Sequence, residues 1–256
     1  MTNLPTPRTH LRPLETLDAG PLLGVLGGMG PLATVSFYRT LVELTPASCD
    51  QEHVRTLIWS DPTIPDRSSA LLGDGISPLA QMRAGVALLE SAGATAIAIP
   101  CNTAHAFVPA LRQESSVPII DMVRAAVADC AAQLPSGGVI GVLATRGTQQ
   151  SKLYDLAARE MGVRVRYPTE RDQGRLVDRA IAMVKGGQDL RGAGALVAEA
   201  NQRLMDAGAG VVVGACTEIP VAAEAAAQRV PLVDSLRSLA MACLQALGVR
   251  PFADAA

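Results

Sequence analysis

The chain consists of two similar halves. Three short signatures occur twice in the same order, at separations of 117, 115 and 113 residues. They are a glycine in an apolar run (Gly24 and Gly141), a cysteine that ends an apolar run (Cys101 and Cys216) and a Val-Pro-apolar-apolar-Asp motif (residues 117–121 and 230–234). Chance does not explain three signatures that keep their order over half the chain, so we interpret the sequence as a duplicated unit.

Each half alternates short apolar runs with amphipathic segments, which is typical of parallel strands joined by helices. Strands are expected at residues 21–27, 54–60, 95–100, 117–121, 139–144, 163–167, 210–215 and 230–234. The helix after the first strand has one apolar face, made of Val35, Tyr38, Leu41 and Val42. The predicted fold class is α/β: two pseudo-symmetric Rossmann-like domains, each a small parallel sheet flanked by helices, with the active site in the cleft between them.

The repeat also sets the expected domain boundaries. Residues 22–120 together with residues 232–250 form the first domain, and residues 121–231 form the second. Residues 1–21 are rich in proline and polar side chains, and we expect them to form a mobile N-terminal tail.

Cys101 and Cys216 each stand where a buried strand runs into small polar residues that open a helix. A helix N-terminus and its free N–H groups favour the thiolate, so this position is expected to lower the pKa of a thiol. Ligands bind beyond the carboxyl ends of parallel strands, so the two thiols are expected to face each other across the cleft. Cys49, Cys130 and Cys243 lack this context, and we interpret them as structural.

Two opposed thiols suit the inversion of a carbon that bears an acidic hydrogen. One thiolate can remove the proton from one face, and the other thiol can return a proton to the opposite face. His105 and Glu218 are near enough in sequence to tune or orient the thiols. Two plainer interpretations stay open: free cysteine also packs as a small apolar side chain, and His105 also suits helix packing.

The composition argues against several other classes of protein. A net charge of −2 and an aromatic content of 3% give no reason to expect a nucleic acid or an anionic membrane as partner. There is no Cys-x-x-Cys pair and no metal-ligand spacing among the three histidines, so neither a zinc site nor a disulfide framework is expected. No apolar run approaches roughly 18 residues and the N-terminus has no secretory h-region, which favours a cytoplasmic enzyme.

Taken together, these residues resemble the cofactor-independent aspartate/glutamate racemase family, and within it the aspartate racemase branch, over about residues 22–247. Six motifs carry the resemblance: Gly27-Gly28-Met29-Gly30-Pro31, Ile64-Pro65-Asp66-Arg67, Pro100-Cys101-Asn102-Thr103-Ala104-His105, Leu143-Ala144-Thr145, Val184-Lys185-Gly186-Gly187 and Gly214-Ala215-Cys216-Thr217-Glu218-Ile219. The two cysteine motifs are the specific ones. The extra alanine before Cys216 departs from the commoner Gly-Cys-Thr-Glu pattern but leaves the thiol in place.

The resemblance implies racemisation of an acidic amino acid, aspartate first and glutamate next, without pyridoxal phosphate or a metal ion. It implies that Cys101 and Cys216 remove and return the α-proton, and that Arg67 and Lys185 hold substrate carboxylates. The other predicted substrate-binding residues are Met29, Asn102, Thr103, Thr145, Thr217 and Glu218. Of these, the resemblance implies that Asn102, Thr103, Thr145 and Thr217 hold the α-carboxylate and amino group. The resemblance also implies a homodimer.

Three other functions stay open at this point. A one-thiol isomerase or decarboxylase of a small diacid has a similar fold but would depend on a single cysteine. A non-catalytic binding protein for amino acids or dicarboxylates would hold its ligand without exchanging the α-hydrogen. A cysteine hydrolase fits less well, because neither half offers a separate base and oxyanion arrangement.

Overall fold

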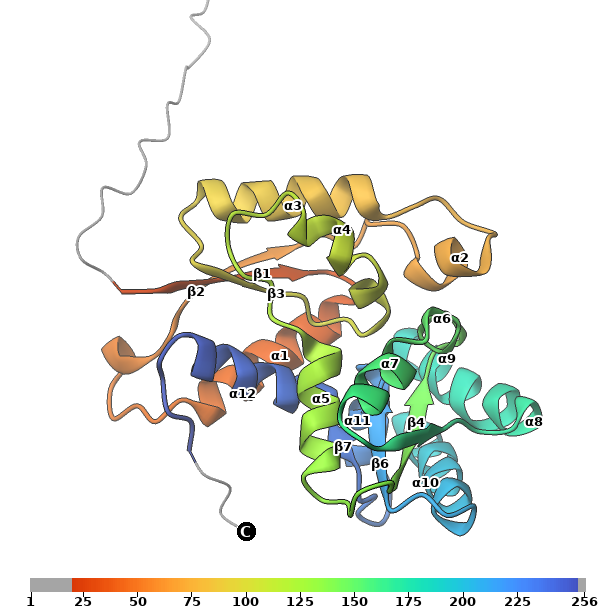
Figure 1. Cartoon of the computed structure of the whole chain (residues 1–256). Coiled ribbons are helices and arrows are strands. Elements are labelled where there is room, and N and C mark those ends of the chain that lie inside the picture. Colours follow the sequence, from red (N-terminus) through yellow and green to blue (C-terminus); the bar gives the residue numbers. More distant parts are fainter. Residues whose placement is uncertain (1–19, 253–256) are drawn as a thin grey trace, which may run out of the picture.

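The computed structural model describes residues 20–252 of the 256-residue chain (Figure 1). These residues form a three-stranded and a four-stranded parallel sheet, each flanked by helices. The predicted α/β fold with two similar halves is therefore confirmed. The expected N-terminal tail lies outside the described residues, except for Gly20 and Pro21.

Strands and helices alternate along the chain. The strands are β1 (Leu22–Gly27), β2 (Arg55–Ser60), β3 (Ala96–Ala98), β4 (Val139–Ala144), β5 (Arg164–Arg166), β6 (Val211–Ala215) and β7 (Val233–Asp234). The longer helices are α1 (Pro31–Leu44), α3 (Leu79–Ser91), α5 (Met122–Ala131), α7 (Leu153–Glu160), α9 (Arg179–Lys185), α10 (Leu190–Asp206), α11 (Glu218–Glu224) and α12 (Ser235–Ala246). The short ones are α2 (Arg67–Leu72), α4 (Val108–Arg112), α6 (Arg146–Ser151), α8 (Glu170–Asp172), the 3₁₀ helices η1 (Asp50–Glu52) and η2 (Thr103–Ala106), and the π-helix η3 (Gln173–Asp178).

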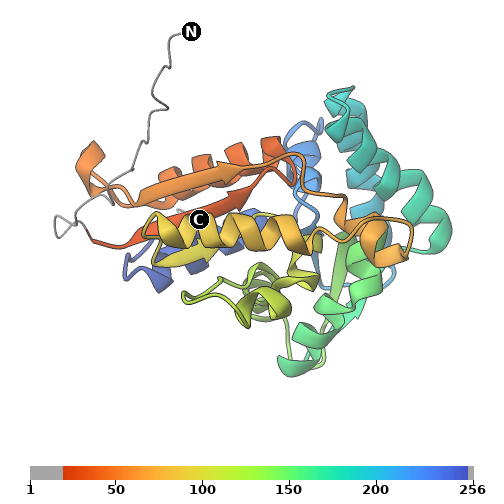
Figure 2. The same ribbon diagram turned by 90° about the horizontal axis from the view of Figure 1, so that it is seen from above.

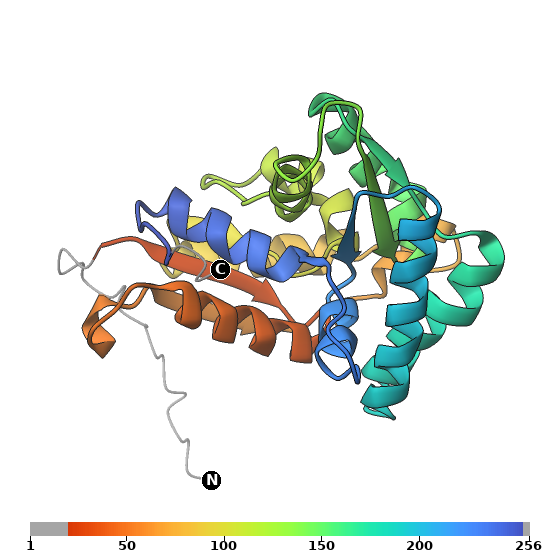
Figure 3. The same cartoon turned by 90° about the horizontal axis from the view of Figure 1, so that it is seen from below.

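The first sheet has the strand order β2-β1-β3, and both pairings are parallel. Helices α1 and α12 lie side by side on one face, while α3 and α4 lie on the other (Figures 1 and 3). Successive residues of a strand point to opposite faces. Leu23 and Val25 accordingly pack with the α1 and α12 side chains, whereas Leu26 packs with those of α3.

The second sheet has the order β5-β4-β6-β7 and is parallel throughout. Leu143 and Val212 pack against α9, α10 and α11 on one face, and Ile140 and Val142 pack against α5 and α7 on the other. The first strand of each sheet is therefore buried on both faces, which explains why both read as continuous apolar runs.

The repeated glycines have the same role in both halves. A Cβ atom at Gly24 would lie 2.9 Å from the Ala94 Cβ, and one at Gly141 would lie 3.0 Å from a Val212 methyl and 3.1 Å from Leu204. All three distances are shorter than ordinary carbon contacts, so the absence of a side chain lets a neighbouring segment approach the strand closely.

Two sequence-based expectations were wrong in detail. Val35 and Tyr38 are 65% and 42% exposed, because the buried face of α1 is instead centred on Phe37 and Leu41. The expected strand at residues 117–121 makes only an isolated parallel bridge, between Ile119 and Ile97. Pro118 has no N–H to donate, so this segment cannot form a full ladder.

The short strand β7 precedes the return of the chain to the first half. Val233 and Asp234 pair with Val213 and Gly214 of the second sheet. The return to the first half comes with α12, which packs against both α1 and α5.

Cys130 on α5 and Cys243 on α12 are both fully buried, and burial raises the pKa of Cys130 to about 12.

Asp234, where β7 runs into α12, is expected to make the stability of the protein depend on pH. Its carboxylate accepts a hydrogen bond from the Leu236 N–H, but burial raises its pKa to about 6 from an ordinary 3.8. The folded state therefore binds a proton more tightly than the unfolded state. The free energy of unfolding should fall as pH rises from about 4 to about 6, by on the order of 2–3 kcal/mol.

The Asp234→Asn variant keeps an acceptor oxygen for the helix cap but removes the ionisation. We expect urea unfolding at pH 4.5 and pH 7 to give a smaller difference in stability for this variant than for the wild type. Asp189→Asn is the matched control, because Asp189 also caps a helix but is exposed. An equal pH difference in wild type and Asp234→Asn would contradict the prediction.

Candidate active site

All ten predicted site residues lie around one small pocket between the two halves. The pocket is lined by Met29, Asp66, Arg67, Ser68, Cys101, Asn102, Thr103, Thr145, Lys185, Cys216, Thr217 and Glu218. Its cavity of about 20 Å³ holds roughly one water molecule. A larger pocket of about 530 Å³ adjoins it and shares Arg67, Lys185, Thr217 and Glu218. The site is therefore nearly closed, with a wider space beside it.

The pocket lies at the carboxyl ends of β3 and β6. Cys101 follows β3 and is 7% exposed, and Cys216 follows β6 directly and is 6% exposed. The helix α2 of the first half contacts α6 of the second half beside the pocket (Figures 1 and 2). At this contact a Cβ atom on Gly147 would come within 2.6 Å of the Ser68 Cα, so the two helices touch through backbone.

The two thiols have different surroundings. The Cys216 thiol donates a hydrogen bond to Glu218 Oε2 at 2.9 Å, and the Thr217 hydroxyl donates to the same oxygen at 3.1 Å. Burial, followed by the adjacent Glu218 carboxylate, raises the pKa of Cys216 well above its ordinary value. The expectation of a lowered pKa is therefore wrong for Cys216 in this structure, because desolvation and a neighbouring negative charge outweigh the start of α11.

Cys101 does not stand at an α-helix. The helix that follows it, η2, is a 3₁₀ helix of four residues, which is too short for an appreciable dipole. The expected helix N-terminus at this position was therefore wrong.

His105 lies behind Cys101 and contacts its backbone, not its thiol. Its Nε2 accepts a hydrogen bond from the Met122 N–H at 3.0 Å, so Nδ1 carries the proton and donates to the Cys101 carbonyl at 2.9 Å. Burial lowers the pKa of His105. The neutral ring thus ties the Cys101 loop to the first turn of α5.

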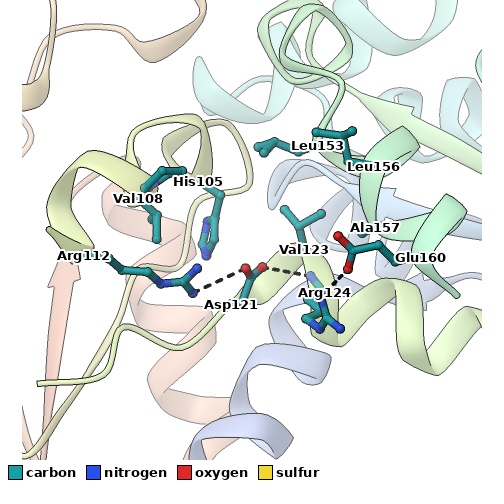
Figure 4. Close-up of a pocket in the computed structure, with 11 residues that line it drawn as sticks. His105, Val108, Arg112, Asp121, Val123, Arg124, Leu153, Leu156, Ala157 and Glu160 are labelled. Carbon is teal, nitrogen blue, oxygen red and sulfur yellow. Dashed lines mark hydrogen bonds and ion pairs between the residues drawn. The ribbon is translucent and has the colours of Figure 1, made fainter.

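His105 also borders a separate pocket of about 130 Å³ (Figure 4). Apolar side chains of α4, α5 and α7 line it, and two ion pairs flank it, Arg112 with Asp121 and Arg124 with Glu160. All four of these charged side chains have partners within the pocket wall.

The Arg67 side chain is fixed by backbone carbonyls. Its Nη1 donates to the carbonyls of Ile64 and Pro65, both at 3.0 Å, and its Nη2 donates to the Met29 carbonyl at 3.2 Å. Arg67 is 9% exposed, and its Nε–H has no partner. The Nε–H and the remaining Nη2–H form one edge of the guanidinium, and this edge matches the two oxygens of a carboxylate.

Lys185 supplies the second cation of the pocket. It ends α9. Desolvation by itself would lower its pKa, but the neighbouring Cys216 and Glu218, with smaller effects of Cys101 and Asp66, raise the pKa above its ordinary value. Lys185 is therefore positively charged near neutral pH.

Three threonine hydroxyls form a cluster across the boundary between the halves. Thr103 Oγ1 lies 2.9 Å from Thr145 Oγ1 and 2.8 Å from Thr148 Oγ1, and the last two are 3.1 Å apart. Thr145 caps α6 by accepting the Thr148 N–H. Thr103 and Thr145 were expected at the site from the sequence, whereas Thr148 was not. No separate signal marks Thr148, because its role comes from the α6 cap.

Asn102 is held by buried hydrogen bonds that the sequence did not reveal. Its Oδ1 accepts from the Tyr154 hydroxyl at 2.7 Å, and its Nδ2 donates to Ser235 Oγ at 3.0 Å. These partners are 52 and 133 residues away in the sequence, so no local motif points to them.

The comparisons with known proteins agree with this geometry. Residues 26–243 match the sequence profile of a family described as Asp/Glu/Hydantoin racemase. The chain belongs to this family. It is therefore an enzyme of the racemase type, an isomerase, as the sequence motifs predicted.

Individual relatives cover almost the whole chain. The solved aspartate racemase of Picrophilus torridus is 29% identical, with a TM-score of 0.78 over 91% of this chain and 96% of that one. The broad specificity amino-acid racemase RacX of Bacillus subtilis is 26% identical over 86% of this chain and 95% of its own length. The glutamate racemase of Deinococcus radiodurans is 31% identical over 84% of this chain and 66% of its own length.

Within residues 20–252, no helix of this racemase-family protein is both long and apolar enough to cross a membrane. The same residues contain no group of three or more His, Cys, Asp or Glu side chains that could hold a metal ion.

Proposed function

We propose that the protein racemises an acidic amino acid, aspartate first and glutamate next, by proton transfer between its α-carbon and two cysteines. The observation that carries the proposal is the convergence of Cys101, Cys216, Arg67 and Lys185 on one pocket. Cys101 and Cys216 offer acid and base groups from the two halves. Arg67 and Lys185 offer the positive charge that an acidic substrate needs.

Arg67 is the proposed site of the side-chain carboxylate. Three of its five N–H groups are bound to backbone carbonyls, and its free edge offers two parallel donors from a buried, rigid position. A carboxylate bound there would satisfy the Nε–H that now lacks a partner. Lys185 adds a second positive charge on the opposite half of the protein.

The threonine cluster is the proposed site of the α-carboxylate. If Thr148 donates its hydroxyl proton to Thr103, then both Thr103 and Thr145 can donate theirs to a bound anion. Thr217, beside Cys216, is the corresponding hydroxyl of the other half. Hydrogen bonds to the α-carboxylate stabilise the charge that develops when the α-proton leaves.

The proposed reaction needs one thiolate and one thiol. The thiolate takes the α-proton, and the electron pair left on the α-carbon is shared with the α-carboxylate. The opposite thiol then gives its proton to the other face, so the two sulfurs exchange protonation states. To act as the base, Cys216 must first lose its own thiol proton. This proton can pass to Glu218 Oε2, to which the thiol already donates a hydrogen bond.

An amino acid is larger than the cavity of about 20 Å³, so the pocket must open to admit it. The contact between α2 and α6 is where the halves would separate. Closure over the substrate excludes water and strengthens each charge contact. The proposal further includes a cytoplasmic homodimer that uses no pyridoxal phosphate, as the motif resemblance implies.

The test is α-hydrogen exchange in deuterated buffer with both enantiomers of aspartate and glutamate. We expect deuterium to enter the α-position together with inversion for at least one of these pairs. Asparagine is the matched control, because it has the shape of aspartate without the side-chain charge, and it should react far more slowly. Exchange without inversion would favour a one-thiol enzyme, and binding without exchange would favour a binding protein.

A further inference from the structure

A continuous chain of buried hydrogen bonds joins the two thiol-bearing loops. The Tyr154 hydroxyl donates to Asn102 Oδ1 at 2.7 Å, Asn102 Nδ2 donates to Ser235 Oγ at 3.0 Å, and Ser235 Oγ donates to the Gly214 carbonyl at 2.7 Å. Asn102 follows Cys101 directly, and Gly214 stands two residues before Cys216. The part of this hydrogen-bond chain from Asn102 to Gly214 therefore links the segment that carries Cys101 to the segment that carries Cys216.

The direction of every bond in this chain is determined. The Gly214 carbonyl can only accept, so it takes the single hydroxyl proton of Ser235. Ser235 Oγ must then accept from Asn102, which places the amide nitrogen of Asn102 towards Ser235 and its oxygen towards Tyr154. The Tyr154 hydroxyl donates its only proton to that oxygen. The orientation of the Asn102 amide is fixed from both ends.

The chain of hydrogen bonds is also sealed from water. Tyr154 and Ser235 are fully buried, and Asn102 is 2% exposed. Water cannot replace a lost partner at such positions, so a broken bond would leave a buried polar group unsatisfied. Each of these hydrogen bonds is therefore costly to break.

The four groups come from different parts of the fold. Asn102 lies after β3 and Ser235 begins α12, both in the first half, while Gly214 is in β6 and Tyr154 is in α7, both in the second half. Ser235 also stands where the chain crosses back from the second sheet to the first half. The chain of bonds thus lies at the crossover between the halves.

We propose that Tyr154 and Ser235 are positioning residues that act through Asn102 to hold the Cys101 and Cys216 loops at a fixed separation and orientation. The proposal rests on the proposed two-thiol function. Neither residue touches the pocket, so neither is a catalytic residue. Proton transfer between two opposed sulfurs requires close alignment, and a misplacement of about 1 Å can cost up to about 100-fold in rate.

The test compares Tyr154→Phe and Ser235→Ala with the matched control Tyr167→Phe. The Tyr167 hydroxyl donates to Asp155 on α7, and neither residue lines the pocket, so this control removes one tyrosine hydroxyl bond outside the site. We expect Tyr154→Phe and Ser235→Ala to lower kcat about tenfold or more in both directions, with KM changed less than about twofold. The isotope effect of α-deuterium on kcat should rise, because proton transfer becomes the slow step. Tyr167→Phe should leave all three quantities unchanged.

A purely structural role predicts a different result. It would lower the thermal unfolding temperature and the fraction of folded enzyme, but kcat per folded molecule and the isotope effect would stay as in wild type. That result in both variants would overturn the proposal. If Tyr154→Phe does not fold, Ser235→Ala decides alone.

A second readout does not depend on the proposed activity. The readout is the rate at which iodoacetamide alkylates Cys101 and Cys216, measured by mass spectrometry of their peptides. We expect this rate to be severalfold higher in Tyr154→Phe and Ser235→Ala than in wild type and Tyr167→Phe. Unchanged alkylation rates would overturn the positioning proposal even if the enzyme is an active racemase. If both variants are alkylated faster than wild type but the wild-type protein exchanges no amino acid, the result supports the positioning role and counts against the proposed function.

Discussion

Replacing either Cys101 or Cys216 with alanine is expected to lower the rate of inversion of the substrate by about 1,000-fold. In the proposed mechanism each thiol supplies the base for one enantiomer and the acid for the other, so the loss of either should block both directions of racemisation. General acid–base catalysis contributes about 10²–10⁴-fold per group, which sets the size of the effect. The measurement is the initial rate of inversion of each enantiomer, followed by circular dichroism or chiral chromatography.

The two cysteine variants should differ in which enantiomer they exchange at the α-position. A single remaining thiolate can still remove and return a proton on the face that it contacts. Cys101→Ala should therefore exchange one enantiomer without inversion, and Cys216→Ala the other. Cys49→Ala is the control, because Cys49 is exposed and lies outside the pocket, and it should keep the wild-type rate. If only one of Cys101 and Cys216 matters, the two-thiol mechanism is wrong and the one-thiol isomerase or decarboxylase gains support.

The sequence predicted the arrangement of the site better than its chemistry. Duplication alone places Cys101 and Cys216 at equivalent strand ends, and the parallel sheets then bring those ends to one pocket. The direction of a pKa shift follows from burial and neighbouring charge, which a motif does not contain. The structure therefore reverses the expected shift at Cys216, where the carboxylate of Glu218 lies 2.9 Å from the sulfur.

Contacts between distant segments were likewise beyond the sequence. Tyr154 sits in a helix with an ordinary amphipathic pattern, and only tertiary packing brings its hydroxyl to Asn102. The buried face of α1 was misassigned for a related reason. Phe37 and Tyr38 are adjacent aromatic residues, and only the tertiary structure shows that Phe37 is the one that packs with the β1 side chains. Periodicity identifies a helix more reliably than it identifies the residues on its buried face.

Replacing Arg67 with alanine is expected to lower kcat/KM for aspartate by roughly 100- to 1,000-fold, about 3–4 kcal/mol. A buried bidentate ion pair with the side-chain carboxylate would be lost, and Lys185 alone would remain to balance the charge. Arg67 also holds the Ile64, Pro65 and Met29 carbonyls, so part of the loss could come from a looser loop. Arg67→Lys separates the two effects in part, because it keeps the positive charge but not the two-donor edge.

The decisive measurement is the ratio of kcat/KM for aspartate to that for asparagine. A looser loop slows both substrates alike and leaves the ratio unchanged. Loss of a carboxylate site slows aspartate more, so the ratio should fall by at least about tenfold in Arg67→Ala and less in Arg67→Lys. Arg83→Ala, which removes an arginine paired with Glu114 outside the pocket, should leave both rates unchanged. If Arg67→Ala lowers the two substrates equally, Arg67 supports the loop alone, and the side-chain carboxylate must be bound elsewhere, with Lys185 as the remaining cation in the pocket.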